Sequence, residues 1–145
     1  MLQKSDNISG LAKALVTFQG EVENIKKDAN NPFFKSKYAS LANILDGIRE
    51  PLSKHGLSFC QFPSGDGELT TILMHSSGEY LCDTFKMSPV KNDPQALGSA
   101  ITYARRYTLA AVLGLNVQED DDGNAASGKE NKVADKFGYG YSINK

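Results

Sequence analysis

Apolar residues recur every three or four positions near the start of the chain, which is the spacing of an amphipathic helix over residues 6–27. Ser5 or Asp6 is placed to cap its first turn, because a side-chain oxygen there can accept a bond from a free backbone N–H. The apolar stripe consists of Ile8, Leu11, Leu15, Phe18, Val22 and Ile25. This stripe has to be covered by the domain's own sheet or by a neighbouring subunit.

A second amphipathic helix follows a break at Asn30-Asn31-Pro32. Ser40 is its predicted N-cap, and Pro51 should kink the helix or confine its last turn. Gly56 suits the left-handed position after the helix. The apolar positions of this helix are Leu41, Ile44, Leu45, Ile48 and Leu52.

Three runs typical of strands come next, at Leu57–Phe62, Glu68–His75 and Glu79–Met87. The glycine-containing linkers 64–67 and 76–78 have the length of hairpin turns. The pattern therefore predicts a three-stranded antiparallel β-meander.

The last helix opens with Asp93 as N-cap and Pro94 at the first helical position, and we follow it through Gly98–Leu115. On a helical wheel, small and apolar residues gather within about 60° of Leu97 and predict the buried face. They are Leu97, Ala100, Ile101, Ala104, Thr108, Ala111 and Leu115. The fold class is therefore α+β, with N-terminal helices, a meander and a long helix.

The same wheel separates the two neighbouring arginines of this helix. Tyr103 and Tyr107 lie one turn apart beside the buried face, Arg105 lies on the opposite flank, and Arg106 points away from the core. The arginines therefore should have separate roles. One can bind phosphate with its planar guanidinium group, and the other can pair with a carboxylate across a subunit boundary or from residues 120–122.

The hydrophobic pattern ends after Leu115. We therefore divide the chain into a domain at residues 1–118 and an acidic, then Gly/Tyr-rich tail at residues 119–145, for which a flexible chain is expected. The run Phe137-Gly138-Tyr139-Gly140-Tyr141 could alternatively stack on bases or dock on a partner.

Length and charge limit the function classes. The 145 residues suit one domain, and the net charge of −1 combines +1 in residues 1–118 with −2 in the tail. Any nucleic-acid site must therefore be a local basic patch. No apolar run reaches membrane-spanning length and no leader pattern is visible, so we expect a cytoplasmic protein.

Catalytic and metal-binding patterns are weak. Cys60 and Cys82 lie outside any Cys-x-x-Cys pair and are expected to be buried, reduced thiols, while His55 and His75 are isolated. The run 123–130 resembles a phosphate loop but ends in glutamate and follows no strand, and 120–131 departs from a calcium loop at two positions. We expect no enzyme activity, no ATP and no dedicated metal site, with only a loose Mg²⁺ contact left open.

Two clusters combine basic and aromatic residues, as single-strand binding proteins do. The candidate DNA-binding residues are Lys35, Lys37, Tyr38, Tyr103, Arg105, Arg106 and Tyr107. The alternative interpretation is that the tyrosines are half-buried packing residues and the charges form a solvated surface.

Two blocks of the sequence carry a resemblance to a known family. The run 98–107, Gly-Ser-Ala-Ile-Thr-Tyr-Ala-Arg-Arg-Tyr, is followed by Leu113-Gly114-Leu115 and by 120–124, Asp-Asp-Asp-Gly-Asn. The other block is 31–39, Asn-Pro-Phe-Phe-Lys-Ser-Lys-Tyr-Ala. In this order the blocks resemble the ERF (essential recombination function) family of phage single-strand annealing proteins, over roughly residues 5–124.

The resemblance implies an ATP-independent protein that binds single-stranded DNA and anneals complementary strands in recombination. It also implies a β-β-β-α core and assembly into rings or filaments. A single-strand-binding protein or an exonuclease of host or phage would be a further partner. The rival function is a passive DNA-coating or protein-interaction module on the same fold.

Overall fold

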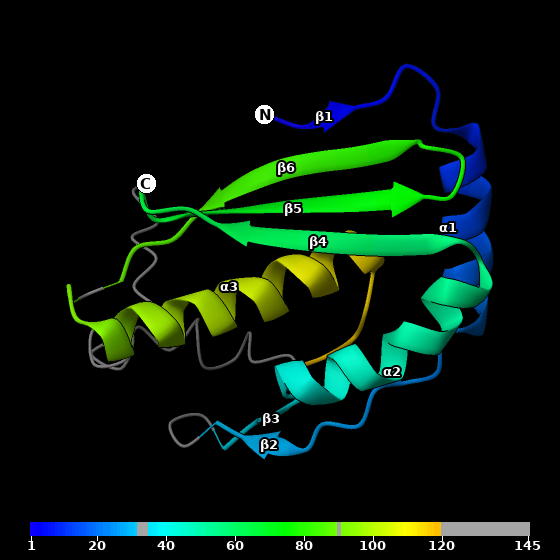
Figure 1. Ribbon diagram of the computed structural model, residues 1–145. Helices are drawn as coiled ribbons and strands as arrows, with labels where there is room; N and C mark the ends of the chain where they lie inside the picture. The colour runs from blue at the N-terminus through cyan, green and yellow to red at the C-terminus, as the bar shows by residue number, and fades with distance from the viewer. Residues whose placement is uncertain (32–34, 90, 120–145) are drawn as a thin grey trace, which may run out of the picture.

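The computed structural model describes residues 1–31, 35–89 and 91–119. Its elements in chain order are β1 (Gln3–Lys4), α1 (Ser9–Glu21), β2 (Ala29–Asn30), β3 (Lys37–Tyr38), α2 (Leu41–Lys54), β4 (Leu57–Pro63), β5 (Glu68–His75), β6 (Tyr80–Lys86) and α3 (Pro94–Leu113). The fold is α+β, as the sequence predicts. Figure 1 shows a sheet in the strand order β1-β6-β5-β4, with the separate β2–β3 pair beyond α2.

The predicted meander is present as β4, β5 and β6, joined by two antiparallel hairpins. The prediction of a three-stranded sheet is wrong, however, because β1 pairs with Leu81 and Cys82 of β6 as a fourth strand. A second sheet, β2–β3, forms around the predicted break. Both additions involve two-residue strands, which are too short to show the alternation that reveals a strand in sequence.

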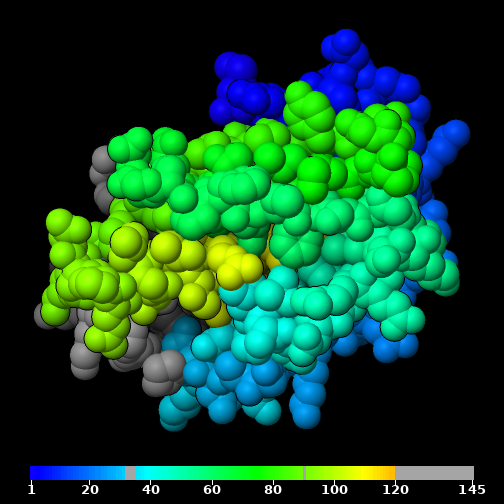
Figure 2. Space-filling view, in the orientation of Figure 1, coloured from blue at the N-terminus to red at the C-terminus, as the bar shows by residue number. Residues whose placement is uncertain are grey.

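The two faces of the sheet differ in what covers them. Odd-numbered residues such as Leu57, Leu69 and Leu73 are buried in the core together with side chains of the helices. Even-numbered residues point to the other face, because side chains alternate along a strand. Figure 2 shows that face in green, with no helix lying over it.

Helix α1 is shorter at both ends than the predicted 6–27 helix. Neither Ser5 nor Asp6 is its cap: Ser5 extends the β1 pairing by donating its N–H to the Tyr80 carbonyl at 3.1 Å. The chain leaves the helix after Glu21. Ile25 still reaches the core, where it packs so closely on Gly47 that a side-chain carbon added there would lie 3.3 Å from it.

The apolar stripe predicted for this first helix is inward-facing. Leu11, Phe18 and Ile25 are buried, and Leu15 and Val22 are partly buried against the same core. The cover is provided by the domain itself, because α1 contacts α2, β4 and β5.

Helix α2 follows its predicted signals. The Ser40 hydroxyl oxygen accepts from the Asn43 N–H at 3.2 Å, Pro51 lies within the last turn, and Gly56 has a φ of +67°. Asp28 supports the same cap, accepting the Ser40 N–H and hydroxyl at 2.8 Å each. These bonds from Ser40 lower the pKa of the Asp28 carboxyl below its ordinary value.

Helix α3 starts as predicted, with an Asp93 side-chain oxygen accepting from the Ala96 N–H at 2.8 Å. It ends at Leu113 because Gly114 takes the left-handed conformation with a φ of +69°. The predicted extension to Leu115 is therefore two residues too long.

The single buried face predicted for this helix is also wrong in part. Ala100 and Ala104 are buried as expected, but Leu97 is 42% exposed and Ala111 is exposed. In the second half the burial moves to the opposite side of the wheel, at Leu109, Ala110 and Leu113. The helix changes faces because its first half packs on the sheet near Leu69 and Met87, whereas its second half enters the core shared with α1 and α2.

Cys60 and Cys82 are free, but they are partly exposed and not buried as predicted. Both lie opposite Ile72 of the central strand β5, on its two sides. Two strand spacings of about 4.8 Å separate them, which is too far for a disulfide within one chain. Their place on the uncovered face of the sheet accounts for the exposure.

Candidate nucleic-acid interface

The chain after α3 turns back and pairs with β3, which brings the two predicted clusters together. Ala39 N–H donates to the Val117 carbonyl at 2.7 Å, and Glu119 N–H donates to the Lys37 carbonyl at 3.1 Å. The Glu119 carboxylate also accepts the Lys37 N–H at 2.9 Å. Residue 119, which we assigned to the tail, is thus fixed to β3. The rest of the predicted tail lies outside the described residues.

Arg106 lies between two tyrosines that are far apart in sequence. Its guanidinium carbon is 4.2 Å from the centre of the Tyr38 ring on β3 and 5.6 Å from the centre of the Tyr103 ring on α3. At these distances the cation is attracted to the faces of both rings. Arg106 is on the side of α3 away from the sheet, as the wheel predicts, but Tyr38 covers it, and Arg106 is therefore only partly exposed.

The aromatic surface continues along α3 toward β6. Tyr103 and Tyr107 are stacked one turn apart, with ring centres 5.6 Å apart and an interplanar angle of 16°. Tyr107 also lies 6.5 Å from the ring of Phe85 on β6, and it is 44% exposed. We call Tyr38, Phe85, Tyr103, Arg106 and Tyr107 the tyrosine–arginine cluster. It combines a cation with an exposed aromatic ring.

The lysines of the first predicted cluster lie next to Tyr38. Lys37 precedes Tyr38 on β3, and both Lys35 and Lys37 are exposed. Lys35 has a φ of +52°, in the left-handed region that costs a residue with a side chain conformational energy. The chain therefore reaches β3 through a tight bend. Lys37 and Tyr38 are consecutive residues of this strand, so their side chains point to opposite faces of it.

Arg105 lies on a different side of α3, facing β4. Its Nε donates to the Gln61 side-chain oxygen at 3.3 Å. The Gln61 amide in turn donates to the Arg105 carbonyl and to the hydroxyls of Thr71 and Thr108, at 3.0–3.2 Å. The structure thus brings together four of the seven predicted site residues, Tyr38, Tyr103, Arg106 and Tyr107, and places Arg105 in a separate polar network.

Sequence reasoning missed Phe85, Gln61 and Glu119. Phe85 was part of a predicted strand, and its alternation with Thr84 and Lys86 shows only that it faces inward. The partners of Gln61 and Glu119 are 44 and 82 residues away in the chain. No local pattern marks such contacts, so only the spatial arrangement reveals them.

We also searched residues 1–31, 35–89 and 91–119 for metal-binding groups and for membrane-spanning helices. There, no group of three or more His, Cys, Asp or Glu side chains is placed to hold a metal ion. In the same part of the chain, no helix is long and apolar enough to cross a membrane. The phosphate-loop and calcium-loop resemblances lie outside the described residues.

The fold and the cluster define a small α+β domain whose surface combines cationic and aromatic side chains. The sequence model of the ERF superfamily matches residues 11–136, which is most of the chain. The chain therefore belongs to the ERF superfamily, whose members act in phage-type single-strand annealing and are not known as catalysts. No curated protein and no solved structure matches the chain.

Proposed function

We propose that this protein binds single-stranded DNA without ATP and anneals complementary strands during recombination, and that it is encoded by a phage. The observation that carries the proposal is the position of the Arg106 guanidinium over the Tyr38 ring, beside the exposed ring of Tyr107. Single-strand binding requires cations for the backbone and aromatic faces for the bases. The cluster supplies both on one surface.

The chemistry of the cluster suits annealing in particular. Stacking on Tyr107 would use the face of a base and leave its hydrogen-bonding edge free for a complementary strand. Lys35, Lys37 and Arg106 would neutralise phosphates, which lowers the repulsion between two approaching strands. Neither step consumes a nucleotide, so we expect annealing without ATP and at most a weak dependence on Mg²⁺.

The two arginines receive different roles in this proposal. Arg106 contacts the DNA backbone, because its guanidinium is part of the tyrosine–arginine cluster. Arg105 is held by Gln61 on the β4 side of α3 and is our candidate for a contact between subunits. Substituting Arg105 by alanine should then change the size of the assembly, measured by light scattering, more than it changes DNA affinity.

The proposal includes assembly into rings or filaments and action in the host cytoplasm. A single-strand-binding protein or an exonuclease is the expected protein partner. Electron micrographs with and without single-stranded DNA test the assembly directly. Only monomers in both samples would contradict it.

The decisive experiment measures duplex formation between two complementary labelled oligonucleotides without ATP, once with Mg²⁺ and once with a chelator. We expect the protein to accelerate annealing in both buffers. The variant Lys13→Ala, which removes an exposed lysine of α1, serves as the matched control and should behave like the natural chain. Binding that slows duplex formation would favour the passive coating module and reject annealing.

A further inference from the structure

Strand β4 forms an unprotected edge of the main sheet. In the strand order β1-β6-β5-β4 it has a neighbour only on the side of β5, among the residues that the structure describes. Its seven residues, Leu57–Pro63, include no charged side chain. Natural proteins usually protect edge strands with charges, prolines, bulges or a covering segment, since an open edge invites another strand. Of these devices β4 has only a proline at its last residue, Pro63, so residues 57–62 stay open.

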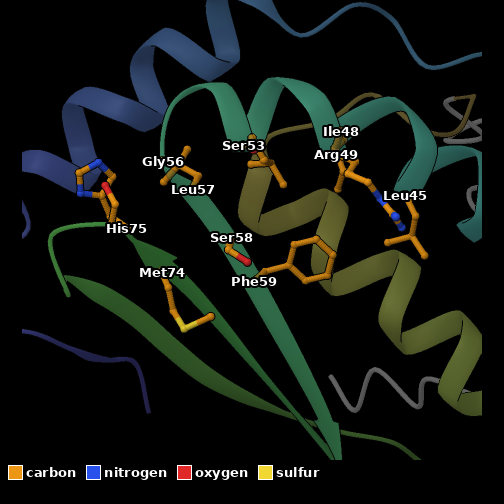
Figure 3. Close-up of a pocket in the computed structure, with 12 residues that line it drawn as sticks. Leu45, Ile48, Arg49, Ser53, Gly56, Leu57, Ser58, Phe59, Met74 and His75 are labelled. Carbon is orange, nitrogen blue, oxygen red and sulfur yellow. The ribbon is translucent and has the colours of Figure 1, made fainter.

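A groove of about 610 Å³ runs beside this edge. Three consecutive residues of β4, Leu57–Phe59, line it, and α2 forms the opposite wall with Leu45, Arg49 and Leu52 among others. Figure 3 shows the Phe59 ring projecting from β4 on the side of α2. The groove is therefore bounded by β4 on one side and on the other by α2, whose wall is largely apolar but includes Arg49. Met74, His75 and Ser76, at the end of β5 and just after it, also line the groove.

This combination favours an extended peptide as the occupant. A peptide that pairs with a free edge gains main-chain hydrogen bonds, and every second side chain enters the adjoining groove. The matching segment should therefore alternate large apolar residues with small ones and carry no charge within the paired stretch.

One segment outside the described residues has this pattern. Residues 137–143 place Phe137, Tyr139, Tyr141 and Ile143 on one face of an extended chain, and only glycine or serine on the other. The segment has no charged residue, as β4 has none. It also begins directly after residue 136, where the superfamily match ends.

The connection to this segment is long enough. Glu119 is fixed to β3, and the 17 residues 120–136 can span up to about 56 Å when extended. Helix α2, which leads from β3 toward the groove, has 14 residues and a length of about 21 Å. The segment can therefore reach the groove of its own chain.

We propose that residues 137–143 add to the free edge of β4 as a further strand of the sheet, with their aromatic side chains in the groove against α2. Docking covers the edge and makes the sheet continuous beyond β4. This inference does not depend on the DNA-binding proposal, because none of the residues that line the groove belongs to the tyrosine–arginine cluster. A second copy of the chain, or another protein, is the competing occupant.

Cysteine cross-linking in the full-length chain tests the position of the segment. In a background with Cys60→Ser and Cys82→Ser, Leu45→Cys is combined in turn with Phe137→Cys, Tyr139→Cys and Tyr141→Cys. Mild oxidation should give a disulfide within one chain for at least one pair, seen as faster migration at monomer mass on a denaturing gel. The matched control replaces Leu45→Cys by Val16→Cys, at a residue of α1 that is 72% exposed.

Three results of this experiment would overturn the proposal. They are cross-links at dimer mass only, no cross-link for any pair, and equal yields with Val16→Cys. The first of these would assign the groove to a second copy.

Hydrogen exchange provides a second measurement that needs no cross-link. The double variant Gly140→Pro and Tyr141→Pro removes two consecutive donors, of which one has to face β4, and so blocks strand pairing. Those backbone amides in the stretch 58–61 of β4 that point away from β5 should then exchange about tenfold faster or more. Ala125→Pro with Ser127→Pro, placed before the segment, should leave them unchanged. Equal exchange in both double variants would reject the docked strand.

Discussion

The two sides of α3 show how neighbouring arginines can have different environments. On the β4 side, Arg105 joins Gln61 in a network that includes the buried Thr71. On the β3 side, Arg106 lies over Tyr38 and next to Tyr103. The residues are adjacent in sequence, but a step of about 100° around the helix gives them different neighbours.

The contacts on the two sides of α3 predict two different roles, one in the stability of the fold and one in DNA binding. Hydrogen bonds of the Arg105 side are made within the molecule and satisfy partly buried polar groups, so they act on folding. The Arg106 side presents an exposed ring and a partly exposed guanidinium group, so we expect it to act on binding. The following predictions test this division, from the largest expected effect to the smallest.

Arg106→Ala should weaken single-strand binding by about 2 kcal/mol, or roughly 30-fold, because a charge-assisted hydrogen bond to phosphate is lost. Arg105→Ala should change the affinity much less. Fluorescence anisotropy with a labelled oligonucleotide measures both. Equal losses in the two variants would remove the distinction between the two sides of α3.

Tyr107→Ala should cost about 1.5 kcal/mol of binding, because a stacking surface for one base disappears. Tyr107→Phe should retain most of the affinity, since its ring still stacks. Tyr80→Ala is the matched control, because Tyr80 is 38% exposed on β6 away from the cluster. A similar loss for Tyr80→Ala would indicate a different DNA path.

Gln61→Ala should lower the free energy of unfolding by about 1 kcal/mol, because the hydroxyls of Thr71 and Thr108 lose a partner. The DNA affinity should stay the same. Urea denaturation is the measurement, and Gln95→Ala at an exposed position of α3 is the control. Loss of binding at unchanged stability would place Gln61 in the DNA site instead.

Lys37→Ala should reduce the slope of log affinity against log salt by about 0.7, the contribution of one phosphate contact on single strands. The Lys13→Ala control should keep the full slope. The measurement is a salt titration of the affinity at constant pH. An unchanged slope for Lys37→Ala would exclude this lysine from the interface.

Asp28→Asn should change the acid dependence of stability only slightly. The pKa of the Asp28 carboxyl is lowered in the folded state, so its stabilisation is present above the ordinary value of 3.8 and is lost as the pH falls through the lower folded value. The variant should therefore lose less stability than the natural chain between about pH 5 and pH 3. Denaturation at several pH values checks this, with the exposed turn residue Asp66→Asn as control.

Several features of the fold could be predicted because their signals are local. The Ser40 and Asp93 caps, the left-handed Gly56 and the three meander strands depend on residues within a few positions of each other. The two basic and aromatic blocks were also visible. Both blocks lie within the superfamily match, and four of the predicted site residues, Tyr38, Tyr103, Arg106 and Tyr107, lie together in the structure.

The remaining features depend on residues that are distant in the chain. In the first turn of α1 the Leu11 N–H donates to the carboxylate of Glu79 at 2.6 Å, and not to the predicted caps Ser5 or Asp6. Residues 117–119 return to pair with β3, and this pairing holds Tyr38 next to Arg106. The second half of α3 is buried on a side that the wheel did not predict, because α1 and α2 pack there.

The sequence by itself thus determined the helix caps, the meander and the chemical character of the site. Tertiary structure decided which residues meet, because burial and long-range hydrogen bonds outweigh the preferences of any single helix or strand. Arg105 and Arg106 illustrate this difference. Their sequence position shows that they point in different directions, but only the packing of β3 and β4 on α3 shows what each of them contacts.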